Sequence, residues 1–129
     1  MPARGRNIAR IVRWTSRAID RGLMVEKGID MIRHTVAFKL KHPPNSKAER
    51  DFLTTGKRLA DIPGVNNFEC LRQTSPKNSF SFGFSMEFNS HEDYQAYNDH
   101  PEHIAFVQNR WIPEIEEFLE IDYEPCEMV

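Results

Sequence analysis

The sequence contains few cysteines, no long hydrophobic run and no common phosphate-binding or hydrolase motif. The two cysteines among 129 residues, Cys70 and Cys126, are too few for a disulfide framework and do not form a C-x-x-C pair. No apolar stretch approaches the roughly 20 residues that cross a bilayer. We therefore expect a protein of the reducing cytoplasm.

Motifs for cofactors and metals are equally scarce. No G-x-G-x-x-G occurs, the Gly56-Lys57-Arg58 triplet lacks the leading glycine and the hydroxyl residue of a P-loop, and no G-x-S-x-G elbow is present. His100 and His103 lie three residues apart, which is not the i,i+4 spacing of a helical zinc site. The sequence predicts neither a cofactor nor a bound metal.

Charge is divided unevenly along the chain. Residues 1–30 carry seven Lys or Arg against three Asp or Glu, a net charge of +4, so residues 31–129 carry −6 of the total of −2. An acidic body repels phosphate backbones, which argues against nucleic-acid binding by residues 31–129. Hydrophobic residues at 40% and charged residues at 28% are typical of one globular domain at this length.

The basic segment 1–30 differs from the rest. Its apolar residues lie near helical spacing with arginines between them: Ile8, Ile11, Val12, Ile19 and Leu23. Three interpretations stay open: an Arg-rich presequence, an amphipathic helix on an anionic membrane surface, or a plain extension upstream of the domain. We expect an extension at 1–30, a domain at 31–129, and membrane contact only through residues 1–30.

Residues 31–88 alternate between strand and helix patterns. The segment MIRHTVAFKLK, residues 31–41, predicts a strand with His34 on its apolar face. Ser46 and Glu49 form a capping box that opens a helix ending at Pro63-Gly64. Two strands follow, at 65–72 and 80–88. The second has five apolar residues on one face: Phe80, Phe82, Phe84, Met86 and Phe88.

The remaining segments complete the fold. Ser90 caps a short helix, Pro101 suits the first turn of another, and Pro113 kinks or ends it. Residues 118–125 form a last strand with three apolar residues on one side: Leu119, Ile121 and Tyr123. The order strand, helix, strand, strand, helix, strand predicts an α+β fold of the ferredoxin-like βαββαβ type, an antiparallel sheet with helices on one face.

The face of this sheet that the helices leave open carries small side chains: Thr35, Ala37, Ser81, Gly83 and Ser85. Small residues let a second sheet approach closely, whereas a solvated face more often carries long charged residues. We therefore expect a homodimer that packs sheet against sheet. A monomer with an open polar face is the alternative.

Four segments together resemble the stress-responsive dimeric α/β-barrel (Dabb) domain family: MIRHTVAFKLK, IPGV, FSMEFNSHEDYQAYNDHPEHIAFVQ and EIDYEP. The resemblance covers residues 31–125 and implies a ferredoxin-like protomer that dimerises into an α/β barrel. The family is functionally mixed. Many members are known only as stress-associated proteins, some form very stable oligomers, and a plant branch cyclises polyketides.

The resemblance to that plant branch implies a pocket between the sheet and the helices. A Tyr–His pair works there, and the matching residues in this sequence are Tyr97 and His103. His34 and His100 match further pocket positions. Phe82 stands where the branch has another pocket histidine, which makes the pocket more apolar and argues against the same substrate.

The chemistry of these residues gives an independent argument for a site. The positive end of the helix after Pro101 disfavours a protonated His103, so a neutral imidazole can accept a proton while Tyr97 donates a hydrogen bond. Two functions stay open: binding of a small apolar molecule by a stress-responsive domain, which we favour, and cofactor-free cyclase, lyase or monooxygenase chemistry. Purely structural roles, as helix caps and core, are the third interpretation.

Overall fold

Residues 31–126, which the computed structural model describes, contain strands and helices in the predicted order. The segment 1–30, predicted to be a separate basic extension, lies outside the described residues. The elements are β1 (Ile32–Leu40), α2 (Lys47–Gly56), η1 (Lys57–Asp61), β2 (Asn66–Arg72), β3 (Phe82–Phe88), α3 (His91–Asp99), α4 (Pro101–Phe106), η2 (Val107–Trp111), α5 (Ile112–Glu114) and β4 (Ile115–Tyr123).

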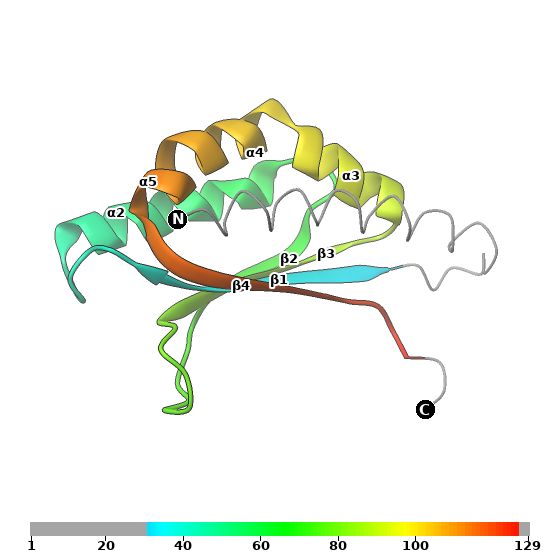
Figure 1. The fold of residues 1–129 in the computed structure, drawn as a ribbon. Helices are drawn as coiled ribbons and strands as arrows, with labels where there is room; N and C mark the ends of the chain where they lie inside the picture. The colour runs from blue at the N-terminus through cyan, green and yellow to red at the C-terminus, as the bar shows by residue number, and fades with distance from the viewer. Residues whose placement is uncertain (1–30, 127–129) are drawn as a thin grey trace.

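The four strands form one antiparallel sheet in the order β2-β3-β1-β4, so β1 and β4, far apart in the sequence, lie side by side. The helices α2 to α5 lie on one face of this sheet (Figure 1). The predicted ferredoxin-like α+β protomer is therefore confirmed. No helix within residues 31–126 combines the length and the hydrophobicity that crossing a membrane requires.

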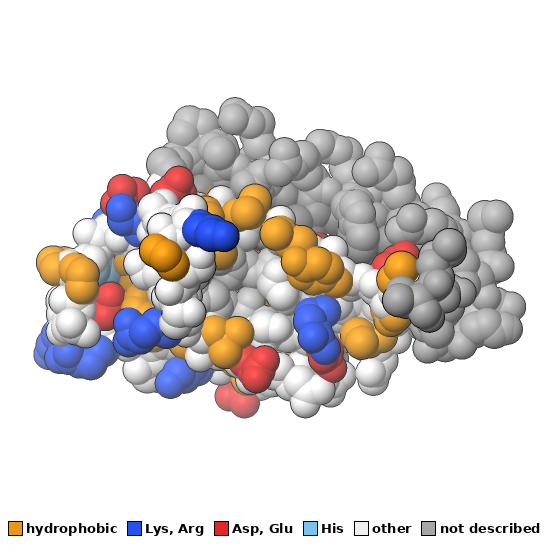
Figure 2. Space-filling view, turned by 90° about the horizontal axis from the view of Figure 1, so that it is seen from below, with side chains coloured by type: hydrophobic (Ala, Val, Ile, Leu, Met, Phe, Trp, Pro, Cys, Tyr) orange, Lys and Arg blue, Asp and Glu red, His pale blue; other side chains and the backbone are white. Residues whose placement is uncertain are grey.

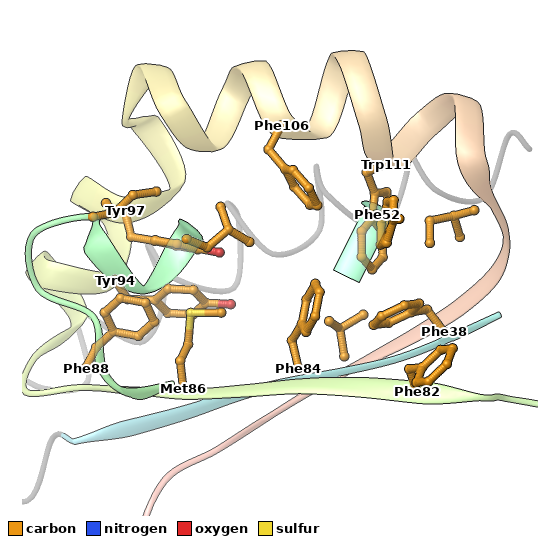
Figure 3. Close-up of a cluster of buried hydrophobic side chains, with 14 of the residues drawn as sticks. Phe38, Phe52, Phe82, Phe84, Met86, Phe88, Tyr94, Tyr97, Phe106 and Trp111 are labelled. Carbon is orange, nitrogen blue, oxygen red and sulfur yellow. The ribbon is translucent and has the colours of Figure 1, made fainter. Parts of the chain in front are cut away.

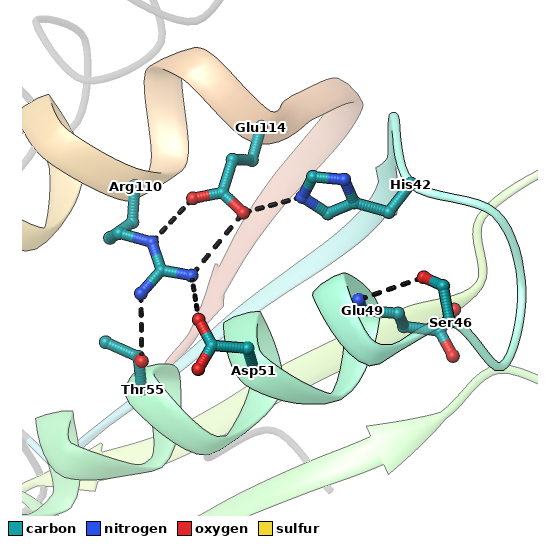
Figure 4. Close-up of polar contacts among 7 residues, drawn as sticks. All are labelled: His42, Ser46, Glu49, Asp51, Thr55, Arg110 and Glu114. Atoms are coloured by element: carbon teal, nitrogen blue, oxygen red, sulfur yellow. Dashed lines mark hydrogen bonds and ion pairs between the residues drawn. The ribbon is translucent and has the colours of Figure 1, made fainter.

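Local signals in the sequence explain where two of the helices begin. The Ser46 hydroxyl accepts a hydrogen bond from the backbone N–H of Glu49 at 3.1 Å (Figure 4). Ser90 caps α3 in the same way through the N–H of Asp93. These contacts satisfy N–H groups that have no partner inside the helix. The helix after Ser46 is regular only to Gly56, and the next five residues form η1, a tighter 3-10 helix.

Two predicted strand boundaries are wrong. β3 begins at Phe82, so Phe80 does not belong to the buried row of that strand and stays partly exposed. β4 begins at Ile115, three residues before the predicted start. Pro113 lies in α5, a helix of only three residues, and the chain becomes extended directly afterwards. Ile115 is consequently buried opposite Leu40 in the sheet.

The core between sheet and helices is largely aromatic (Figure 3). The ring of Phe38 lies 4.8 Å from that of Phe84 and 5.1 Å from that of Trp111, centroid to centroid. At the other end, Phe88 stacks on Tyr94 at 4.9 Å. The sheet contributes the predicted apolar rows of β1 and β3: Ile32, Val36, Phe38, Leu40, Phe82, Phe84, Met86 and Phe88.

β4 turns its apolar row away from this core. Leu119, Ile121 and Tyr123 are exposed on the face of the sheet that carries no helix. Because successive side chains of a strand alternate between faces, Glu120 and Asp122 point towards the helices instead. Two carboxylates therefore lie on the inner face of an edge strand.

Gly56 lets the helix layer approach the sheet closely, and alanine should not fit there. A Cβ atom at Gly56 would lie 2.5 Å from Phe84 Cζ, in a ring that packs against Phe38 and Phe68. Overpacking outweighs the gain in helix propensity, so we expect Gly56→Ala to lower the free energy of unfolding by about 1 kcal/mol. Urea denaturation measures this loss. Thr54→Ala, at an exposed position of α2, is the control, and an unchanged Gly56→Ala would contradict the close approach.

Candidate functional site

A small cavity of about 50 Å³ lies between the sheet and the helix layer. Its apolar lining comes from both layers: Val36, Leu59, Phe84, Met86, Phe106, Val107 and Trp111. Its polar lining comes from β1, α3, α4 and β4: His34, Tyr97, Asn98, His103 and Glu120. Three of the predicted site residues, His34, Tyr97 and His103, therefore meet at one cavity.

His103 lies in the first turn of α4, and its ring contacts that of Tyr97 at a centroid distance of 4.4 Å. His103 Nδ1 is 3.1 Å from the carbonyl oxygen of Asn98. A carbonyl only accepts, so Nδ1 carries the proton and Nε2 is left as the acceptor. Burial lowers the pKa of His103 to about 4, and the ring is neutral at pH 7 as the sequence predicts, with burial as the main cause.

His34 is paired with a carboxylate that the sequence patterns did not single out. His34 Nδ1 lies 2.6 Å from Asp122 Oδ1, and the Tyr94 hydroxyl donates to Asp122 Oδ2 at 2.8 Å. Because the carboxylate accepts from the ring, Nδ1 of His34 carries a proton. Burial alone would lower the pKa of His34, but the hydrogen bond and charge of Asp122, with the charge of Glu120, raise it above its ordinary value.

A signal for Asp122 was present in the sequence. The sequence predicts Leu119, Ile121 and Tyr123 on one side of the strand, so Asp122 lies on the opposite side, which in the structure faces the helices. In the sheet, Asp122 lies directly opposite His34. Without the register between β1 and β4, the pattern alone could not show which side chain of β1 it would meet.

The ring of Tyr97 lies close to the rings of both histidines, His34 and His103. Its ring centroid is 6.3 Å from that of His34, and its side chain is almost fully buried. Burial raises the pKa of Tyr97, so the phenol stays protonated and can donate. Within residues 31–126 the Tyr97 hydroxyl makes no hydrogen bond, and the buried side-chain nitrogen of Asn98 makes none either. Two donors at this cavity are therefore available to a ligand.

The other two predicted pocket residues are not among the residues that line the cavity. His100 is the N-cap of α4, and its Nδ1 accepts a hydrogen bond from Glu102 N at 3.1 Å. This is the capping role that the sequence left open. Phe82 is buried at the far end of β3, where its ring packs against Phe38 and lies 5.2 Å below the guanidinium of Arg72.

The polar groups of the site can move protons but are not arranged to hold a metal. In the described part of the chain, no group of three or more His, Cys, Asp or Glu side chains is placed around a common point. Two histidines whose pKa values are shifted in opposite directions do line one cavity. Such a pair supplies a proton acceptor and a proton donor near neutral pH.

Comparisons with known proteins agree with this fold. The family model of the stress responsive A/B barrel domain, Dabb, matches residues 32–125. A Dabb family protein of Mesorhizobium loti, with a ferredoxin-like fold in its crystal structure, is 58% identical with a TM-score of 0.73, over 74% of this chain and 97% of that chain. No curated protein matches.

Two more distant structures share the fold alone. A hydroxynitrile lyase from Passiflora edulis is 18% identical with a TM-score of 0.68, over 77% of this chain and 96% of that chain. A dimeric protein of unknown function from Bacteroides fragilis is 24% identical with a TM-score of 0.59, over 74% and 97%. The family match covers most of the chain and the Mesorhizobium protein agrees with it, so the chain belongs to the stress responsive A/B barrel domain family.

Proposed function

We propose that this stress-responsive domain is a homodimer that binds a small, mainly apolar molecule with one hydrogen-bonding group. The observation that carries the proposal is the Asn98 amide, a buried donor without a partner within residues 31–126, beside the Tyr97 hydroxyl at a cavity that is otherwise mostly apolar. A buried donor without a partner costs about 1–3 kcal/mol. A ligand that brings an acceptor to these groups recovers that free energy.

The size and lining of the cavity define the class of ligand. A volume of about 50 Å³ is small beside the 300–1,000 Å³ typical of pockets for drug-sized molecules, so only a small group is enclosed. Phe84 and Met86 on the sheet side and Phe106 and Trp111 on the helix side favour an apolar body. The acceptor of the ligand then lies towards Tyr97.

The open face of the sheet supports the homodimer. Four large apolar side chains there are 41–52% exposed: Leu71, Leu119, Ile121 and Tyr123. Viewed from this side, hydrophobic side chains lie among charged ones across the strands (Figure 2). In the row that crosses all four strands, Gly83 and Ala37 lie between Leu71 and Leu119.

This arrangement of small residues on the middle strands and large ones on the outer strands suits a second sheet. The loop between β2 and β3 also extends to the open side of the sheet, away from the helices (Figure 1). The Bacteroides fragilis structure of the same fold is described as dimeric. A second copy of this chain is therefore the partner that best fits the open face.

A second candidate function is cofactor-free lyase chemistry, which the opposite pKa shifts of the two histidines favour. Neutral His103 removes a hydroxyl proton, the oxygen forms a carbonyl as the adjacent C–C bond breaks, and the leaving carbon takes a proton from protonated His34. Two groups with separated pKa values suit these roles. The Passiflora edulis structure of the same fold is a hydroxynitrile lyase.

Replacing Tyr97 tests the binding function. Because the Tyr97 hydroxyl makes no hydrogen bond within residues 31–126, Tyr97→Phe should leave the thermal midpoint nearly unchanged while weakening 1-hexanol binding roughly fivefold. Tyr94→Phe is the matched control, because it removes a hydroxyl that donates to Asp122. That variant should lose about 1.5–3 kcal/mol of unfolding free energy. Calorimetric titration and melting curves measure both, and unaltered hexanol binding in Tyr97→Phe would refute this assignment.

Gly83→Arg tests the homodimer. A Cβ atom at Gly83 meets only the carbonyl oxygen of Val36, at 3.4 Å, so the position accepts a side chain without a change of fold. Arginine would project from the middle of the open face and bring a charge into the interface. We expect a monomer by light scattering at micromolar concentration, with Gly83→Ala as the dimeric control. A dimer of unchanged mass in Gly83→Arg would exclude packing through this face.

The lyase candidate predicts a bell-shaped pH profile with mandelonitrile as substrate. Activity should rise as the pH passes about 4, where His103 loses its proton. It should fall above pH 6.5, because His34 has a raised pKa and loses its proton only there. His103→Asn should abolish the activity, since an amide cannot take the proton. Benzaldehyde formation, followed by absorbance, is the measurement. Wild-type rates at the level of buffer alone would leave only the binding function.

A further inference from the structure

An open groove on the helix layer shares a wall with the inner cavity. The groove has a volume of about 300 Å³ and lies between α2 with η1 on one side and α4 with η2 on the other. Its own lining includes Ile62, Ala105 and Asn109. Leu59 and Phe106 line both the groove and the cavity. These two side chains are therefore the wall between the cavity and the groove.

This wall is made of apolar contacts only. Leu59 is 6% exposed and Phe106 is 8% exposed, and Phe106 extends from the helix layer towards the sheet (Figure 3). Within residues 31–126 no hydrogen bond or ion pair joins η1 to α4. Rotation of the two side chains consequently breaks no polar contact. Phe106 is also the last residue of α4 before the π-helix η2, a type of segment that is frequent at functional sites.

The other end of the groove is fixed by a polar cluster around Arg110 (Figure 4). The Arg110 guanidinium donates to Glu114 at 2.5 Å, to Thr55 at 3.0 Å and to Asp51 at 2.9 Å. Glu114 Oε1 is also 2.6 Å from Nε2 of His42, which follows β1. Arg110 thus ties η2 to α2 by hydrogen bonds. At Phe106, by contrast, only the packing of side chains separates the cavity from the groove.

We propose that the ligand is an unbranched chain with a polar head, and that its chain passes between Leu59 and Phe106 into the groove. Tyr97 of α3 and His103 of α4 hold the head, while Phe106, three residues after His103 in α4, borders the groove. A volume of about 50 Å³ encloses the head and first carbons, and the groove accepts the rest. This inference rests on the proposed binding function and adds the ligand class and its route.

Chain length gives the test, with 1-alkanols from butanol to decanol as probes. Ala105→Trp fills the groove, because Ala105 is exposed and lines the groove but not the cavity. Ala60→Trp is the matched control at an exposed position of η1 that lines neither space. In the wild-type chain and in Ala60→Trp, each added methylene should tighten binding roughly fourfold along the whole series. In Ala105→Trp the gain should stop once the cavity is full.

Each outcome of the titrations decides the inference. Equal chain-length dependence in Ala105→Trp and the wild type would overturn the route through the groove, and so would a plateau at short chains in the wild type. Both results leave the proposed binding function intact. No binding of any alkanol to the wild type would overturn the binding function and the inference together. Should Ala105→Trp melt early, Asn109→Trp fills the groove from η2 and repeats the test.

Discussion

The hydrogen bond between His34 and Asp122 joins the first strand of the domain to the last, and the rest of the structure depends on it. Both side chains are about nine-tenths buried, so each needs the other as a polar partner. A shift of β4 by one residue would carry Asp122 to the open face and bring Ile121 into the core. The pair therefore fixes the register of the edge strand, and with it which side chains face outwards.

The same pair sets the chemistry of the cavity. His34 has the Asp122 carboxylate beside it, whereas the hydrogen-bond partner of His103 within residues 31–126 is a backbone carbonyl. Two imidazoles at one cavity consequently differ in how readily they hold a proton. The Tyr97 ring contacts both imidazole rings, but its hydroxyl forms no hydrogen bond with either of them. The difference between the two histidines at this cavity thus comes from their unequal environments rather than from a distinctive sequence motif.

Periodicity predicted the layers of this protein well, because a half-buried strand must alternate. The buried faces of β1 and β3 and the helix starts at Ser46 and Pro101 follow directly from local sequence. Two features depend on how distant segments pack together, so the local sequence could not predict them. The partner of His34 comes from 88 residues away, and the cavity wall joins η1 to α4. His100 shows the converse, since proximity in sequence to His103 did not bring it into the cavity.

The length of the π-helix η2 determines how Phe106 and Trp111, two aromatic side chains of the helix layer, lie relative to each other. In a regular α-helix, five residues rotate the chain by roughly 500°, which would leave Phe106 and Trp111 about 140° apart around the axis. The wider i→i+5 turn returns them to one side, where their ring centroids are 6.4 Å apart. Deleting a single residue here would restore the regular helix and leave the two rings four residues, or about 40°, apart, so they would stay on one side of it. The π-helix therefore holds one more residue than a regular turn while keeping both rings over the core, and it shifts every later residue by one position.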